Sequence, residues 1–439
     1  MVNTRTGQSL YAKARAMIPG GTQLLSKRPE MFLPGTWPAY YESAKGIVVT
    51  DLDGNDFRDF AIGGVGATIL GYADPEVNAA VKGALDRGNM TTLNPPEEVA
   101  LAERLISLHP WAEMARFARA GGEAMAVAVR IARAFKGRAT VAFCGYHGWH
   151  DWYLSANLAE ERALDGHLLP GLSPKGVPPG LKGLMQPFHY NDLGELKRIA
   201  STHGSDLAAI VMEPVRESYP SPAFLEGVRQ LADETGAVLV FDEVTSGFRI
   251  NTGGIHCTLG INPDIAVFAK ALGNGYPVSA IIGRGEVMQV AQESFISSTA
   301  WTESIGPVAA LAMLEKHERE NVPAQLIRTG QAVKSAWRDA ASHAGLNIHV
   351  TGLDPLAHLG FEGKNAAAQR TLFTQEMLDR GFLAGAAFYA MAAHRKEDIA
   401  DYSDACREVF GLIASALSAG KLESHLRGPV AHSGFKRLT

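Results

Sequence analysis

Short apolar runs alternate with longer segments of helical periodicity through the middle of the chain. The clearest run covers residues 237–241, rich in valine, and stops on the polar residues 242–245. A second run, at 265–268, stops on a lysine and a glycine-rich turn at 269–275. Runs of this length, with β-branched or aromatic members and turn residues at their ends, predict buried strands.

The same pattern repeats on both sides of these two runs. Further strands are predicted at 114–117, 140–143 and 207–212, with helices at 97–108, 123–136, 222–234 and 305–317. This alternation predicts a mostly parallel sheet with helices on both faces, an α/β fold. Residues 154–187 are rich in Gly, Pro and Leu without a clear period, so we expect a long loop or lid over a site.

Both ends of the chain have a different character from the middle. Residues 8–18 show helical spacing, and the segments 47–51 and 57–60 flank an Asp-Gly turn, which predicts a hairpin. Beyond residue 320, helices are predicted at 322–344, 369–380 and 397–419, and strands at 348–351, 357–361 and 382–384. We therefore expect residues 1–70 and 319–439 to form a smaller α+β domain, and residues 71–318 to form a large α/β domain.

The composition narrows the function classes. Apolar residues make up 46% of the 439 residues and charged residues 20%, typical of a globular protein. A net charge of −5 gives no basic footprint for nucleic acid, and no apolar run approaches the roughly 20 residues that span a bilayer. The polar first ten residues lack a secretory signal, and the three scattered cysteines suit a reducing compartment. We expect a cytoplasmic protein that binds neither nucleic acid nor membrane.

The ends of the two clearest strands carry an acid and an amine. Asp242 follows the first run and Lys270 the second. Ligands of open α/β sheets bind beyond the carboxyl ends of the strands, so we expect both side chains in one crevice. This pair suits pyridoxal phosphate: the amine forms a Schiff base with the aldehyde, and the carboxylate stabilises the protonated ring nitrogen. Taken alone, the pair could also be a simple salt bridge.

A glycine turn precedes the helix predicted at 123–136. Gly121 and Gly122 stand between this helix and the strand at 114–117. Free backbone N–H groups and the positive end of a helix dipole favour a phosphate at such a turn. Two glycines before a helix are common, so the turn is a candidate phosphate site only in combination with other motifs.

Aromatic and imidazole side chains gather after the strand at 140–143. Tyr146 stands where an aromatic ring could stack on a flat heterocycle. His147 and His150 are spaced as on one helical turn, so a zinc site is conceivable, but no third ligand follows at metal-like spacing. A packed surface turn is the third possibility.

The motifs of this chain, taken together and in their order along the sequence, resemble those of the class III aminotransferases of the fold type I pyridoxal-phosphate enzymes. The resemblance is greatest to the glutamate-1-semialdehyde 2,1-aminomutase branch. The resemblance extends from Leu10-Tyr-Ala-Lys-Ala14 and Ile18-Pro-Gly-Gly-Thr22 to His394-Arg-Lys-Glu-Asp-Ile399. The specific motifs between them are Val49-Thr-Asp-Leu-Asp-Gly-Asn55, Leu70-Gly-Tyr-Ala-Asp-Pro75, Tyr146-His-Gly-Trp-His150, Met212-Glu-Pro-Val215, Phe241-Asp-Glu-Val-Thr-Ser-Gly-Phe-Arg249 and Ala269-Lys-Ala-Leu-Gly-Asn-Gly-Tyr-Pro277.

The resemblance implies a role for each matching residue. Lys270 would be the Schiff-base lysine and the proton carrier, and Asp242 the partner of the pyridine nitrogen. Val244 would pack on one ring face and Tyr146 on the other.

The resemblance also implies how the phosphate is held. Gly121 and Gly122 match the phosphate turn, and Thr299 matches a threonine that reaches a phosphate across a homodimer interface. Glu213 matches a carboxylate near the cofactor.

Departures from the family pattern cluster where substrate would bind. Val65 stands in place of an aromatic residue, and Ala386 in place of a late glutamate. The arginine for the substrate carboxylate falls near Lys27 or Arg28, and with His150 these are the polar candidates for substrate binding. We therefore do not expect glutamate-1-semialdehyde as the substrate. The phosphate turn departs too, since alanine and glycine at 120 and 122 replace two hydroxyl residues.

Three functions remain open at this point. The first is an aminotransferase that moves an amino group from a small-molecule amino donor to a carbonyl acceptor. The second is an intramolecular aminomutase with the same machinery. The third is a protein that binds the cofactor without turnover, which the altered phosphate turn would allow.

Overall fold

The computed structural model describes residues 2–167 and 170–434. Two compact units share the chain: one comprises Met1–Asp74 and Ala324–Thr439, and the other Pro75–Pro323. Our domain assignment, with boundaries at 70/71 and 318/319, stays a prediction. Within the described residues, no helix combines the length and the apolar character needed to cross a bilayer.

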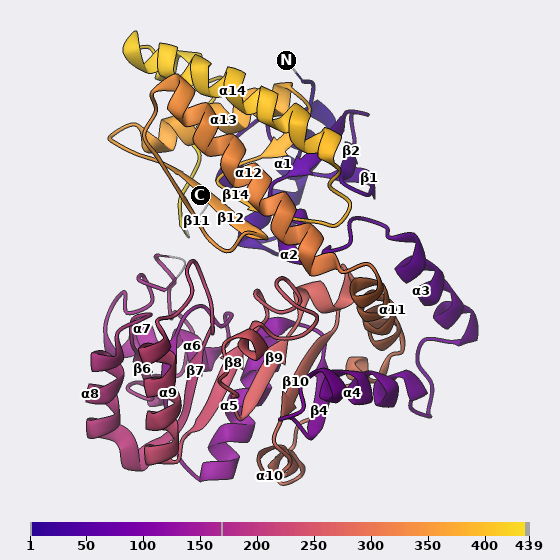
Figure 1. Cartoon of the computed structure of the whole chain (residues 1–439), viewed down its shortest axis with the longest axis vertical. Helices are drawn as coiled ribbons and strands as arrows, with labels where there is room; N and C mark the ends of the chain where they lie inside the picture. The colour runs from indigo at the N-terminus through magenta and orange to yellow at the C-terminus, as the bar shows by residue number, and fades with distance from the viewer. Residues whose placement is uncertain (1, 168–169, 435–439) are drawn as a thin grey trace. The chain divides into compact units, whose positions relative to one another are not determined.

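The unit Pro75–Pro323 is built on a seven-stranded sheet (Figure 1). Its strands, in spatial order, are β4 (Met114–Ala118), β10 (Ser279–Gly283), β9 (Ile265–Phe268), β8 (Val238–Asp242), β7 (Leu207–Met212), β5 (Thr140–Cys144) and β6 (Met185–Pro187). All pairs are parallel except those of β10, which runs antiparallel to both β4 and β9. The expected mostly parallel sheet is therefore confirmed.

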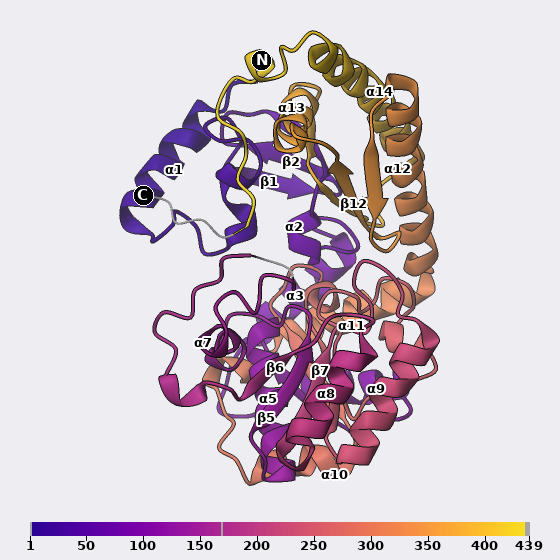
Figure 2. The ribbon, with the colours of Figure 1, turned by 90° about the vertical axis from the view of Figure 1, so that its left-hand side faces the viewer.

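Both faces of this sheet are buried under helices. Along β8, Val238 and Val240 pack in the core that includes α5 (Gly121–Lys136), whereas Leu239 and Phe241 pack in the core that includes α8 (Leu193–His203) and α9 (Pro222–Thr235). Alternate residues of a strand point to opposite faces, so a strand apolar at every position must be covered on both sides. Helices α8 and α9 lie side by side (Figure 1 and Figure 2).

The remaining helices of this unit are α3 (Pro75–Arg87), α4 (Pro96–Leu108), α6 (Asp151–Leu154), α7 (Ala156–Ala159), α10 (Gly285–Met288) and α11 (Ile305–Arg319). The predicted loop at 154–187 is irregular over most of its described length, but it contains α7 and ends in β6. Strands β6 and β10 were not predicted. Strand β6 has only three residues and ends in a proline. Strand β10 has two isoleucines among small residues, so neither forms a clear apolar run.

The other unit contains two small sheets. One has the order β1 (Tyr41–Lys45), β2 (Val48–Asp51), β3 (Asp56–Phe60), β13 (Phe382–Ala384), and the other the order β11 (Ile348–Thr351), β12 (Leu356–Phe361), β14 (Ala387–Tyr389). Its helices are α1 (Arg5–Met17), α2 (Gly63–Gly66), α12 (Val322–Ala344), α13 (Ala366–Asp379) and α14 (Lys396–Ser418). The predicted hairpin is β2–β3, and β13 pairs with β3 in parallel. Segments from before and after the large unit in the sequence therefore share one sheet.

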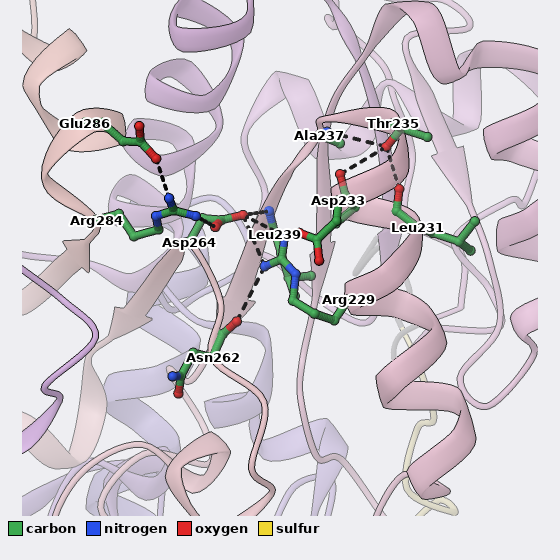
Figure 3. A network of polar contacts seen from close by, with 11 residues as sticks. Arg229, Leu231, Asp233, Thr235, Ala237, Leu239, Asn262, Asp264, Arg284 and Glu286 are labelled. Carbon is green, nitrogen blue, oxygen red and sulfur yellow. Dashed lines mark hydrogen bonds and ion pairs between the residues drawn. The ribbon is translucent and has the colours of Figure 1, made fainter.

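A buried carboxylate fixes the amino-terminal edge of the large sheet (Figure 3). Asp264, directly before β9, accepts hydrogen bonds from both terminal nitrogens of Arg229 (3.2 Å each) and from the backbone N–H of Leu239 (2.8 Å). Its other oxygen accepts from Arg284, which also binds Glu286. These contacts connect β8, β9, α9 and the end of β10, opposite the edge where the candidate site lies.

Candidate active site

The carboxyl ends of five strands bring the predicted site residues to one edge of the sheet. Asp242 is the last residue of β8, and Lys270 comes two residues after β9. Glu213 follows β7, Tyr146 comes two residues after β5, and Gly121 comes three residues after β4. Because β4 runs in the same direction as these parallel strands, all five residues emerge on the same side.

Asp242 is held in one orientation by two donors. Nδ1 of His147 donates to its Oδ2 at 2.8 Å, and the backbone N–H of Val244 donates to its Oδ1 at 3.0 Å. The other ring nitrogen of His147 lies 3.1 Å from the carbonyl oxygen of Cys144, so the imidazole has a polar neighbour at both nitrogens. The partner of Asp242 is thus His147 and not Lys270, which argues against the simple salt bridge between Asp242 and Lys270.

Lys270 presents its amine to the same region. Its Nζ donates to Oγ1 of Thr245 at 2.8 Å. Burial lowers the pKa of the Lys270 amine, the positive charge of Arg249 lowers it further, and the charges of Asp242 and Glu213 act in the opposite direction. An amine with a lowered pKa spends more time uncharged, which is the form that attacks a carbonyl carbon.

The backbone at Lys270 is unusual. Its φ of +47° lies in the left-handed region, at the start of the short 3-10 helix η6 (Lys270–Gly273). Non-glycine residues in this region are uncommon and concentrate at functional sites.

The amino terminus of α5 forms a cradle without a side-chain cap. The helix begins at Gly121, two residues earlier than predicted, and Ala120 before it has no side-chain acceptor. A Cβ on Gly121 would lie 2.9 Å from Cγ1 of Val244, and one on Gly122 would lie 3.2 Å from Nδ1 of His150. Glycine therefore allows Val244 and His150 to approach the helix end closely. The free N–H groups there suit an anion.

His150 lies at this helix end. Among the described residues, its Nδ1 is buried without a hydrogen-bond partner. Burial lowers the pKa of His150, which favours the neutral ring. A buried, unpartnered ring nitrogen beside the free N–H groups of a helix end suits a phosphate oxygen, so the residues present fit pyridoxal phosphate.

Glu213 supports the Tyr146 loop. Its Oε2 accepts the backbone N–H of Tyr146 at 3.1 Å, and burial raises the pKa of Glu213. Gly145, with φ of +114°, is required between the two, since a Cβ there would lie 2.6 Å from Oε2 of Glu213. The Tyr146 ring packs edge-on against Tyr153, with centroids 5.8 Å apart.

Three further predicted site residues are Thr299, Lys27 and Arg28. Thr299 begins the short 3-10 helix η8 (Thr299–Thr302) and is exposed. Lys27 and Arg28 belong to the other unit, where Lys27 is exposed and the Arg28 guanidinium lies against Gly20. Their substrate role stays a prediction.

Three site residues were not predicted: His147 as the partner of Asp242, Thr245 as the acceptor for Lys270, and the buried Arg249. His147 was considered only as a zinc ligand. Thr245 and Arg249 stood inside a motif that we quoted, but nothing in a sequence says which way such side chains turn.

Comparisons with known proteins show the family of this chain. A family profile described as aminotransferase class-III matches residues 34–393. The chain is 32% identical over 413 residues to a 3-aminobutyryl-CoA aminotransferase of Cloacimonas acidaminovorans, covering 91% of this chain and 95% of that one. It is 33% identical over 435 residues to a glutamate-1-semialdehyde 2,1-aminomutase of Heliobacterium modesticaldum, covering 93% and 97%.

A solved structure has the same fold. The FumI protein of Sphingopyxis sp. MTA144, in its pyridoxal-phosphate internal aldimine form, superposes with a TM-score of 0.85 at 25% identity, covering 94% of this chain and 97% of that one. The sheet, the strand-end site and these relatives lead to one conclusion. The chain belongs to the class III aminotransferases, fold type I enzymes that use pyridoxal phosphate.

Proposed function

We propose that this aminotransferase works through Lys270 and Asp242, and moves an amino group between two different molecules, an amino donor and a carbonyl acceptor. When bound, pyridoxal phosphate supplies the electron sink that stabilises negative charge at the substrate carbon. The observation that carries the proposal is the lowered pKa of Lys270 beside a carboxylate held by two donors.

Each residue has a separate task. Lys270 supplies the amine that holds the cofactor, and its Nζ later carries the proton to and from the substrate carbon. The Oγ1 of Thr245 accepts a hydrogen bond from this Nζ, so it positions the amine while the amine is not bound to the cofactor. Asp242 provides the negative charge opposite the ring nitrogen, and His147 keeps that carboxylate from turning away.

The helix end and its neighbours hold the rest of the cofactor. The N–H groups at Gly121 and Gly122 and the ring of His150 would donate to the phosphate, in place of the two hydroxyl residues that Ala120 and Gly122 replace. Val244 and Tyr146 bracket the ring, and both are half-buried. Glu213 keeps the Tyr146 loop in place.

Intramolecular amino transfer is the second candidate, because the chain is 33% identical to a protein described as an aminomutase. A half-reaction distinguishes them: excess amino donor is added to the holoenzyme, and the released product is measured. An aminotransferase releases a free keto product and leaves the aminated cofactor. Rearranged amine without any released keto product would overturn the intermolecular reaction.

The substrate itself is open to a donor and acceptor screen, read by conversion of the cofactor to its aminated form. Val65 and Ala386 at positions where the aminomutase resemblance implies larger or charged residues favour a substrate other than glutamate-1-semialdehyde. Lys27 and Arg28 are the proposed carboxylate contacts, and substitution of either should raise KM for a carboxylate substrate more than it lowers kcat.

We also propose a homodimer in the cytoplasm. Thr299 is exposed on its own chain, as is Phe295 nearby at 89%, which suits a surface covered by a second copy. The free thiols of Cys144, Cys257 and Cys406 suit a reducing compartment. Sedimentation of the wild type and a Phe295→Asp variant tests the dimer, which should dissociate more readily in the variant.

A further inference from the structure

Three arginines bind the backbone around the segment that carries Thr299. Residues 295–298, directly before η8, form neither helix nor strand. Nη1 of Arg130 donates to the carbonyl of Phe295 at 3.1 Å, and Nη2 of Arg116 donates to the carbonyl of Ile296 at 2.7 Å. Carbonyls in an irregular segment lack the partners that a helix or sheet supplies, and these charged donors take their place.

Arg119 holds the other end of the segment. Its Nη2 donates to the carbonyls of Trp301 (2.9 Å) and Glu303 (3.1 Å), and it forms an ion pair with Oε1 of Glu303 at 2.7 Å. Both side chains of this ion pair are only 13% exposed, so solvent screens their attraction little. The same carboxylate accepts the backbone N–H of Gly306, in the first turn of α11. This end of the segment is therefore tied to the residue that follows β4.

The segment has buried and exposed side chains in turn. Ile296 and Trp301 pack against the core that includes α5, whereas Phe295, Ser297 and Thr299 are exposed. The arginines and the two apolar side chains thus fix the backbone to β4 and α5 of its own chain, while the Thr299 hydroxyl stays accessible.

A fixed backbone suits the role proposed for Thr299. In the proposed homodimer, this hydroxyl reaches the phosphate of the cofactor that the other copy holds. Ordering a mobile loop at the moment of contact costs affinity, so a loop already ordered on its own chain binds better.

We propose that Arg116, Arg119 and Arg130 are positioning residues for the cofactor site of the other copy, because they hold residues 295–303 in the shape that presents Thr299. This role rests on the homodimer and on the contact of Thr299 proposed above. Each arginine would act on the site of the other chain rather than on its own.

A local effect is the competing explanation. Arg119 stands two residues before Gly121, so its loss could disturb the phosphate turn of the same chain. The two explanations differ in which chain of the dimer is affected, and this difference can be measured.

Mixed dimers separate the two explanations. One chain is wild type and the other, with a different tag, carries Lys270→Ala, so only the wild-type chain forms a Schiff base. The absorbance then reports the cofactor Kd of the wild-type chain alone. Adding Arg119→Met to the Lys270→Ala chain should raise this Kd about tenfold, since charged hydrogen bonds that order Thr299 are lost. An unchanged Kd would overturn the proposal, because a local effect stays on the variant chain.

A second variant covers the case in which the Arg119→Met chain does not assemble. Arg116→Met leaves both the phosphate turn and the ion pair with Glu303 in place, and it removes the bond to the carbonyl of Ile296. It should raise the Kd of the wild-type chain in the same direction, and an unchanged Kd would again overturn the proposal.

Thr299→Ala in place of Arg119→Met distinguishes failure of the inference from failure of the proposed function. It should raise the Kd of the wild-type chain by a similar factor. No rise would overturn the proposed role of Thr299 and, with it, the role of the arginines. A rise with Thr299→Ala but none with Arg119→Met would overturn the role of the arginines alone.

Arg138→Met is the matched control. Arg138 also donates to two carbonyls, those of Leu207 and Thr235, but at the amino-terminal end of β7. Placed on the Lys270→Ala chain, this variant should leave the Kd of the wild-type chain unchanged. A rise as large as that with Arg119→Met would contradict a specific role for the three arginines.

Discussion

One methyl group at Gly121 should weaken cofactor binding through Val244. A Cβ at this position would lie 2.9 Å from Cγ1 and 3.1 Å from Cγ2 of Val244, closer than side chains tolerate. Val244 is half-buried, so in cofactor-free protein it can swing into the open site and relieve the clash. Bound cofactor would occupy the space into which the Val244 side chain turns. The Gly121→Ala variant should therefore fold normally and bind pyridoxal phosphate less tightly.

The magnitude follows from the cost of overpacking. An extra methyl in a packed site costs about 1–3 kcal/mol, which corresponds to a Kd raised about 5- to 150-fold. Titration of the cofactor-free protein, followed by absorbance, measures this Kd. Urea unfolding without cofactor should show little change in the free energy of unfolding.

A double-mutant cycle isolates the contact. Val244→Ala removes both methyl groups that the added Cβ would meet, so Gly121→Ala/Val244→Ala should bind the cofactor better than the sum of the two single effects predicts. Gly411→Ala is the matched control, because its added Cβ meets nothing within 4 Å. Additive effects, or an unchanged Kd in Gly121→Ala, would refute the placement of Val244 against the ring.

Three further predictions concern charge. Asp242→Asn should keep the cofactor but lose about 10- to 1,000-fold in kcat. An adjacent carboxylate raises the pKa of the pyridine nitrogen by about 1–3, and the variant loses that effect. A fully active variant would contradict the role of Asp242. Asp264→Asn should lower the free energy of unfolding by about 1.5–3 kcal/mol, and the exposed Glu286→Gln should change it by less than about 0.5 kcal/mol, as urea titrations would show. Burial lowers the pKa of His167 to about 4, below its unfolded value near 6.5, so its contribution is complete above pH 6.5 and is lost as the pH falls toward 4. His167→Gln should accordingly reduce the loss of unfolding free energy between pH 7 and pH 4.5, and an equal loss in both proteins would be evidence against it.

The sequence predicted that Asp242 and Lys270 lie at the same edge of the sheet, because each follows a predicted strand. Short apolar runs that stop at Asp242 and just before Lys270, each followed by turn residues, predict buried parallel strands, and the last residues of such strands lie at one edge of the sheet. Gly121 and Gly122, between a strand and a helix, predicted a phosphate site at the free N–H groups of the helix end. These inferences need only local pattern and topology, which a sequence carries.

The side-chain directions could not be predicted in the same way. His147 and His150 are three residues apart in one motif, yet one binds Asp242 and the other faces Gly122, because the turn through Gly148, with φ of +103°, separates them. The Asp-Glu pair at 242 and 243 divides likewise between the cofactor site and His256. Such divisions depend on tertiary packing.

Reduction of the holoenzyme with borohydride, followed by peptide mapping, tests the central claim most directly. Borohydride fixes the cofactor to the amine that holds it, and the proposed mechanism predicts a single label on Lys270, absent from a Lys270→Ala variant. A label on any other lysine, or none at all in cofactor-saturated protein, would contradict the proposed active site.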